Sequence, residues 1–137
     1  MTSRLNPYLS FNGNARDAME FYRSVFGGEL TVSTFGEFGN PDPAMAGKIM
    51  HAQLETDAGY TLMGSDVMPD MPFHPGDTIT ISLSGDDGDR LREYWRKLSD
   101  GGTVATQLEK QMWGDEFGMC TDRFGVAWLV NISQSQS

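Results

Sequence analysis

The second half of this sequence repeats the pattern of the first half, and this repeat constrains the fold more than any other feature. The tetrapeptide EFYR at 20–23 returns as EYWR at 93–96, each time inside a helical pattern. Two glycines follow both helical segments, at 27–28 and at 101–102, and a turn containing Asp and Gly precedes the last strand of each half. Three matches in the same order favour the duplication of one unit of about 65 residues, which is too long for a solenoid repeat.

Each half predicts the element order strand, helix, strand, strand, strand. Apolar residues at the spacing of an amphipathic helix predict helices over 14–26 and 87–100, with Asn14 and either Asp86 or Asp87 as caps. The expected strands are 7–12, 29–35, 48–55 and 60–65 in the first half, and 77–84, 103–108, 118–121 and 126–131 in the second. We therefore expect an α+β fold of two βαβββ modules, 1–68 and 75–137, which a proline-rich connection joins into a single domain over 1–137.

Composition and charge exclude several classes of function. With a net charge of −9 and a pI near 4.4, we expect no non-specific binding to nucleic acid or to an anionic membrane, since both need basic patches. No apolar run approaches the roughly 20 residues that span a bilayer, and no signal peptide opens the chain, so we expect a cytoplasmic protein. The single cysteine, Cys120, excludes an internal disulfide, and its place in a strand pattern predicts a buried structural thiol.

His51 is the polar residue with the widest chemical range. It lies with Gln53 on the polar face of the expected strand 48–55. An imidazole there could act as an acid, a base or a hydrogen-bond donor in a cavity. It could equally be a half-buried histidine that is tied to a neighbouring strand.

Four further residues are candidates for the lining of a pocket. Thr78 and Thr80 could present hydroxyls to a cavity, although alternating hydroxyls are also normal on an exposed sheet face. Trp113 and Phe117 suit an apolar pocket, and core packing explains them nearly as well.

Long segments of the chain resemble one known family. They read PYLSFNGNARDAMEFYRSVFGGEL at 7–30, IMHAQLE at 49–55, LMGSD at 62–66 and WGDEFGMCTDRFGVAWLVN at 113–131. These segments are similar to PhnB-like proteins of the vicinal oxygen chelate superfamily, the glyoxalase, bleomycin-resistance and dioxygenase group. The resemblance implies two βαβββ modules whose curved mixed sheets surround a cavity, which a homodimer usually completes. Some PhnB-like proteins are labelled ubiquinone-pathway methyltransferases, but no Gly-rich loop here follows a strand and opens a helix, as a nucleotide-type cofactor would require.

The resemblance also implies where a metal ion would lie. Metal-using relatives place His, Gln or Glu at four cavity positions, on the first and last strands of each module. Carried over by spacing, these positions hold Pro7, Met63, Thr78 or Thr80, and Leu129. Proline, a thioether and leucine cannot hold a catalytic divalent cation, so we expect no metal and no other cofactor.

Three functions remain open, and whether the protein is an enzyme remains open with them. The first is a small-molecule binding protein, or an enzyme of unassigned reaction, with a metal-free dimeric cavity and His51 as acid or base. The residues expected to line that cavity are Gln53, Met63, Thr78, Thr80, Trp113, Phe117 and Leu129. The second is a metal-dependent glyoxalase-type lyase or isomerase that uses His51 and Glu116. The third is a bleomycin-type resistance protein, in which the acidic chain would favour a cationic drug.

Overall fold

The computed structural model describes residues 3–40, 42–68 and 70–134. The chain divides into two compact units, Met1–His74 and Pro75–Ser137. The first unit contains β1 (Tyr8–Phe11), α1 (Ala15–Phe26), β2 (Glu29–Thr34), the 3₁₀ turn η1 (Gly36–Phe38), α2 (Pro43–Ala46), β3 (Ile49–Glu55) and β4 (Thr61–Asp66). The second contains β5 (Ile81–Gly85), α3 (Gly88–Ser99), β6 (Thr103–Lys110), β7 (Glu116–Thr121) and β8 (Ala127–Ile132). That the two units together make one domain stays a prediction.

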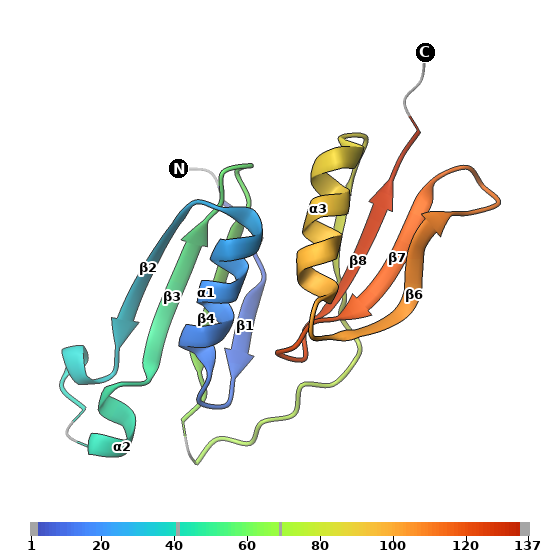
Figure 1. The fold of residues 1–137 in the computed structure, drawn as a ribbon. Helices are drawn as coiled ribbons and strands as arrows, with labels where there is room; N and C mark the ends of the chain where they lie inside the picture. Colours follow the sequence, from blue (N-terminus) through green and yellow to red (C-terminus); the bar gives the residue numbers. More distant parts are fainter. Residues whose placement is uncertain (1–2, 41, 69, 135–137) are drawn as a thin grey trace. The chain divides into compact units, whose positions relative to one another are not determined.

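Both units have the same topology, which confirms the predicted α+β fold of two βαβββ modules. The strand order is β1-β4-β3-β2 in the first sheet and β5-β8-β7-β6 in the second. In each sheet the first strand runs parallel to the last, and the other neighbours are antiparallel. Each sheet carries one long helix, α1 or α3, on one of its faces (Figure 1).

The turn before the last strand also repeats. The residue that follows the third strand of each unit, Thr56 or Asp122, donates its backbone N–H to the carbonyl four residues later, at 2.9 and 2.8 Å. A glycine then donates back to that same residue at 3.0 Å in both units. These shared hydrogen bonds support the duplication inferred from the sequence.

The apolar stripe of α1 packs on one face of the first sheet and forms the core of that unit. The buried helix residues are Ala15, Ala18, Met19, Tyr22, Val25 and Phe26. On β3 and β4 the residues Ala52, Leu54 and Leu62 are buried, and a Cβ added at Gly64 would lie 3.2 Å from the Met19 sulfur. Because side chains alternate along a strand, the intervening residues of β3 and β4 lie on the opposite face.

Trp128 anchors the core of the second unit. It is 1% exposed, and its Nε1 donates to Oδ2 of Asp122 at 2.8 Å. Asp122 also accepts the backbone N–H groups of Phe124 and Val126, at 2.8 and 3.1 Å. A single carboxylate therefore fixes the turn and the indole of the strand that follows it.

The predicted strand over 77–84 is wrong in its first half. β5 begins at Ile81, and Thr78 and Thr80 lie in the irregular connection before it. Alternating side chains predict a strand, but a strand also needs a hydrogen-bonding partner. β5 pairs with β8 from Ile81 opposite Trp128, and the chain turns away just before β8, so residues upstream of Ile81 have no strand beside them in this sheet.

The predicted N-cap residues are confirmed, but the way in which the helix starts are capped was predicted wrongly. Asn14 and Asp87 occupy the N-cap positions of α1 and α3, but neither side chain makes a capping hydrogen bond. At α1 the acceptor is Asp66, at the end of β4: its Oδ1 accepts the N–H groups of Gly13 and Ala15 at 3.0 and 2.9 Å. Its other oxygen accepts the N–H of Ile49 at 2.9 Å. Asp66 therefore joins α1, β3 and β4, and it is only 5% exposed.

Candidate functional site

The predicted site residues of the first unit lie together on the sheet face opposite α1. His51 and Gln53 project from β3, and Met63 projects from β4 directly opposite Gln53. On the other side of β4, Tyr8 of β1 pairs with Met63. We call this surface, with Tyr8, His51, Gln53, Glu55 and Met63, the site face.

Tyr8 contacts His51 across β4, the strand that separates their own strands. Its hydroxyl lies 3.4 Å from Nδ1 of His51, and the two ring centroids are 5.8 Å apart at a tilt of 36°. Tyr8 is 48% exposed, and His51 is half-buried. We did not predict Tyr8 as a partner of His51 from the sequence. The one signal that the sequence offers is the position of Tyr8 on the polar face of a short strand.

Glu55 is the centre of a second group of contacts on the site face. Gln53 Nε2 donates to its Oε1 at 2.6 Å, and the Thr61 hydroxyl donates to its Oε2 at 2.7 Å. Arg4 lies 3.5 Å from the same carboxylate. The hydrogen bond from Thr61, followed by that from Gln53, lowers the pKa of the Glu55 carboxyl below its ordinary value. Glu55 therefore stays ionised and accepts hydrogen bonds.

The predicted site residues of the second unit form an apolar surface of their own. Leu129 of β8 lies opposite Met119 of β7, and Phe117 lies two residues before Met119, on the sheet face away from α3. Trp113, in the loop before β7, meets Phe117 edge to face with ring centroids 5.9 Å apart.

The two units have diverged at equivalent sheet positions. Aligned by strand register, the residues His51, Gln53 and Met63 correspond to Phe117, Met119 and Leu129. Only the first unit keeps polar groups there, so the site face is the stronger candidate for chemistry.

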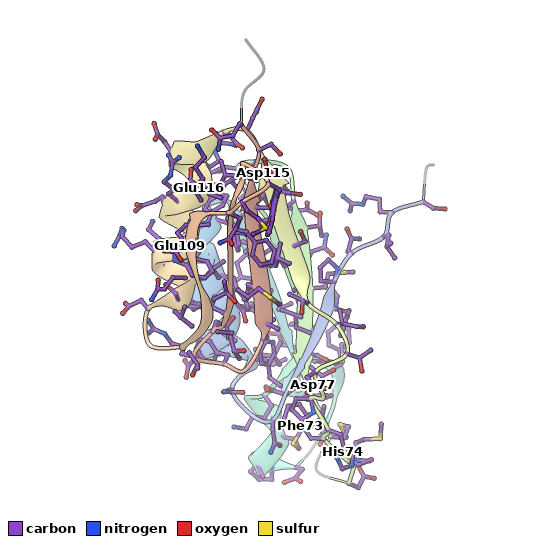
Figure 2. The ribbon with its side chains drawn as sticks, turned by 90° about the vertical axis from the view of Figure 1, so that its right-hand side faces the viewer. Phe73, His74, Asp77, Glu109, Asp115 and Glu116 are labelled. Atoms are coloured by element: carbon purple, nitrogen blue, oxygen red, sulfur yellow. The ribbon has the colours of Figure 1, made fainter. Side chains whose placement is uncertain are left out.

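The remaining candidates lie elsewhere in the chain. Thr78 and Thr80 are in the connection before β5, which also contains the exposed His74 and Asp77, both labelled in Figure 2. Glu116, at the start of β7 (Figure 2), lies in the second unit and accepts a hydrogen bond from Arg92 Nε of α3 at 3.2 Å. The Arg92 partner lowers the pKa of Glu116. A metal ion at Glu116 would have to displace this arginine, which weakens the hypothesis of a metal site built from His51 and Glu116.

The residues at the superfamily's metal positions do not fit a divalent ion. Pro7 offers only its backbone carbonyl, which already accepts the N–H of Met63 at 3.1 Å. Met63 and Leu129 offer a thioether and an alkyl group, and Thr78 and Thr80 lie outside the strand. Within 3–40, 42–68 and 70–134, no three His, Cys, Asp or Glu side chains gather as a metal site requires. The absence of a metal stays a prediction.

Cys120 is expected to be nearly unreactive in the folded protein. It is 3% exposed, and burial, followed by the nearby Asp122 carboxylate, raises the pKa of its thiol to about 11. Compared with the ordinary value of 9.0, this lowers the thiolate fraction at pH 8 about a hundredfold. Reaction with a chromogenic disulfide reagent should be slow in native buffer and fast in guanidinium chloride. Equal rates in the two solutions would contradict a buried structural thiol.

The shared topology of the two units defines the class of protein. A domain from Frankia sp. EAN1pec, described as a glyoxylase/bleomycin resistance protein/dioxygenase domain, has the same fold at 12% identity, with a TM-score of 0.66 over 98% of this chain and 99% of its own. This likeness shows that the structure has the glyoxalase/bleomycin resistance/dioxygenase fold. The chain belongs to the PhnB-like family, whose model, described as 3-demethylubiquinone-9 3-methyltransferase, matches residues 3–131.

Two relatives match the chain over nearly its full length. The protein YjdN of Escherichia coli is 32% identical, over 96% of this chain and 97% of its own. The crystal structure of protein PA1353 from Pseudomonas aeruginosa is 38% identical, with a TM-score of 0.87 over 98% of this chain and all of that one. Among the described residues, no helix combines the length and the apolar character needed to cross a membrane.

Proposed function

We propose that this protein binds a small molecule at the site face without a metal ion, and that a second copy of the chain covers that face to complete the cavity. The observation that carries the proposal is the contact of Tyr8 with His51 beside the Gln53–Glu55 pair. These polar side chains, with the thioether of Met63 beside them, supply the few polar groups and the apolar contact that a small-molecule site combines. We also propose that the protein acts in the cytoplasm.

Binding is favoured over rapid turnover. The site face offers one imidazole, one phenol, one amide and the Glu55 carboxylate, which already accepts hydrogen bonds from Gln53 and Thr61. Any reaction there would therefore depend on acid–base chemistry at His51. Such chemistry contributes about 10²- to 10⁴-fold to a rate. The family description names a methyltransferase, but we do not assign that activity, because the chain lacks the Gly-rich strand–loop–helix motif of nucleotide-type cofactor sites.

The test is a fragment screen by amide NMR, with two histidine variants as a matched pair. A ligand of the site face should shift amides of β3 and β4, and His51→Ala should weaken its binding about tenfold, the loss of one good hydrogen bond. His74→Ala replaces the other histidine, which is exposed, and should leave binding unchanged. Shifts confined to other elements, or equal binding by the His51 variant, would refute the proposal.

The proposed homodimer is tested separately by light scattering at micromolar concentration. A mass near twice the 15.2 kDa of one chain is expected. The expectation follows from the site face, where half-buried polar and apolar side chains are more readily covered by a partner than left in water. A mass near that of one chain would refute the dimer.

A further inference from the structure

We infer that the site face selects its ligand through one fixed donor and one fixed acceptor: Tyr8 orients His51 to present Nε2–H, and Glu55 orients Gln53 to present Oε1. The ligand class that fits is a short, uncharged compound with a carbonyl oxygen and a hydroxyl or amide N–H group. This inference rests on the proposed function and adds to it which group of the site face donates a hydrogen bond to the ligand and which group accepts one.

The contact with Tyr8 determines which ring nitrogen of His51 carries the proton. A neutral imidazole carries one N–H, and the hydrogen bond at one ring nitrogen decides which nitrogen holds it. The Tyr8 hydroxyl faces Nδ1 at 3.4 Å. A phenol is a better donor than an imidazole N–H, and an imidazole nitrogen is a better acceptor than a phenol oxygen. Tyr8 therefore donates to Nδ1, and the proton of His51 stays on Nε2, where it can reach a ligand.

The contact with Glu55 determines which way the side-chain amide of Gln53 is turned. An ionised carboxylate only accepts hydrogen bonds, so the group facing Glu55 at 2.6 Å must be the NH₂ of Gln53 and not its carbonyl. The lowered pKa of Glu55 keeps the carboxylate ionised at neutral pH. Thr61 holds the other carboxylate oxygen at 2.7 Å, so Glu55 itself has little freedom to turn. The carbonyl Oε1 of Gln53 is thereby directed away from Glu55.

The spacing of the two groups limits the size of the ligand. His51 and Gln53 stand two residues apart on one strand, so their Cα atoms are about 6.6 Å apart and their side chains share a face. A molecule of a few carbon atoms can bridge such a pair. Met63, paired with Gln53 on β4, supplies an apolar contact beside it. An ammonium ligand could donate to the carbonyl of Gln53 but would leave the N–H of His51 without an acceptor, so it would use only one of the two groups.

The tautomer of His51 and the orientation of the Gln53 amide can both be measured without any ligand. Nitrogen-15 NMR of the imidazole should show His51 at neutral pH mainly as the Nε2–H tautomer, and Tyr8→Phe should shift it toward a mixture. Tyr60→Phe, at another partly exposed tyrosine of the same unit, is the matched control and should change nothing. The two NH₂ protons of Gln53 should differ in chemical shift by more than those of a free primary amide, and Glu55→Leu should reduce the difference to the free-amide value. Glu29→Leu on the neighbouring strand should leave the difference unchanged. A dominant Nδ1–H tautomer in the wild-type protein would overturn the inference, even if a variant fails to fold.

Ligand preference is tested with three probes: hydroxyacetamide, acetone and ethylammonium. Hydroxyacetamide, which offers both a donor and an acceptor, should bind the site face at least threefold more tightly than either other probe. Tyr8→Phe and Glu55→Leu should each reduce this preference to less than twofold. If the three probes bind the site face equally, the inference is wrong and the proposed function survives. If none of them shifts the site face, the ligand class is refuted, and if the fragment screen also finds no ligand there, the proposed function fails too.

Discussion

Replacing Asp66 by alanine is expected to lower the free energy of unfolding by about 4 kcal/mol, because three backbone N–H groups lose their acceptor at once. The carboxylate accepts from Gly13, Ala15 and Ile49 at 2.9–3.0 Å. A donor left buried without a partner costs roughly 1–3 kcal/mol, and alanine cannot admit water to all three. Urea unfolding monitored by circular dichroism measures the loss, with an unchanged m-value as evidence that the folded state is still native.

Two variants separate the role of Asp66 from a general effect of charge. Asp17→Ala removes an exposed carboxylate from the first turn of the same helix and should cost less than about 1 kcal/mol. Asp66→Asn keeps one acceptor oxygen but turns an NH₂ group toward one of the three donors, so its cost should fall between the two alanine variants. A loss for Asp66→Ala no larger than that for Asp17→Ala would show that this carboxylate does not hold the helix and the sheet together.

The contacts of Asp66 with the start of α1 could not be predicted from the sequence. The periodicity of both helices predicted their bounds within one residue, because amphipathic spacing is a local property. Capping is local only when the side chain belongs to the helix start, and here the acceptor comes from 51 residues downstream of Ala15. At α2 the local rule would have succeeded: Asp42 accepts from Ala44 at 3.0 Å and Pro43 follows it at the first helical position.

The candidate site likewise combines features that the sequence predicts locally with features that depend on the whole sheet. Alternation along 48–55 placed His51 and Gln53 on one face, since side-chain direction follows from strand geometry alone. Their partners were not predictable. The contact of Tyr8 with His51 depends on β4 lying between β1 and β3, and strand order is a property of the whole sheet. Thr78 was misplaced for the same reason, because alternation does not reveal whether a partner strand is present.

Gly28→Ala is expected to cost about 4 kcal/mol, since two separate penalties meet at this position. Its φ of +104° disfavours any residue with a side chain, and an added Cβ would lie 2.0 Å from the backbone carbonyl oxygen of Glu55. The oxygen cannot move aside without disturbing the end of β3, which carries Glu55 of the site face. Thermal or urea unfolding gives the loss directly.

Three other glycines separate the two penalties. Gly59 has a φ of +90° and no atom within 4 Å of an added Cβ, so Gly59→Ala should show the backbone cost alone, about 1 kcal/mol. Gly102 is the equivalent of Gly28 in the second unit. Its φ is not in the positive region, but an added Cβ would lie 2.2 Å from the carbonyl oxygen of Thr121. Gly102→Ala should therefore show the steric cost alone, about 3 kcal/mol. Gly47 has neither feature and should change stability by less than about 0.5 kcal/mol. If the residue after each helix approaches its strand equally closely in the two units, the losses of stability for Gly59→Ala and Gly102→Ala should sum to the loss for Gly28→Ala. A Gly28→Ala variant no less stable than the Gly59→Ala variant would refute the close contact.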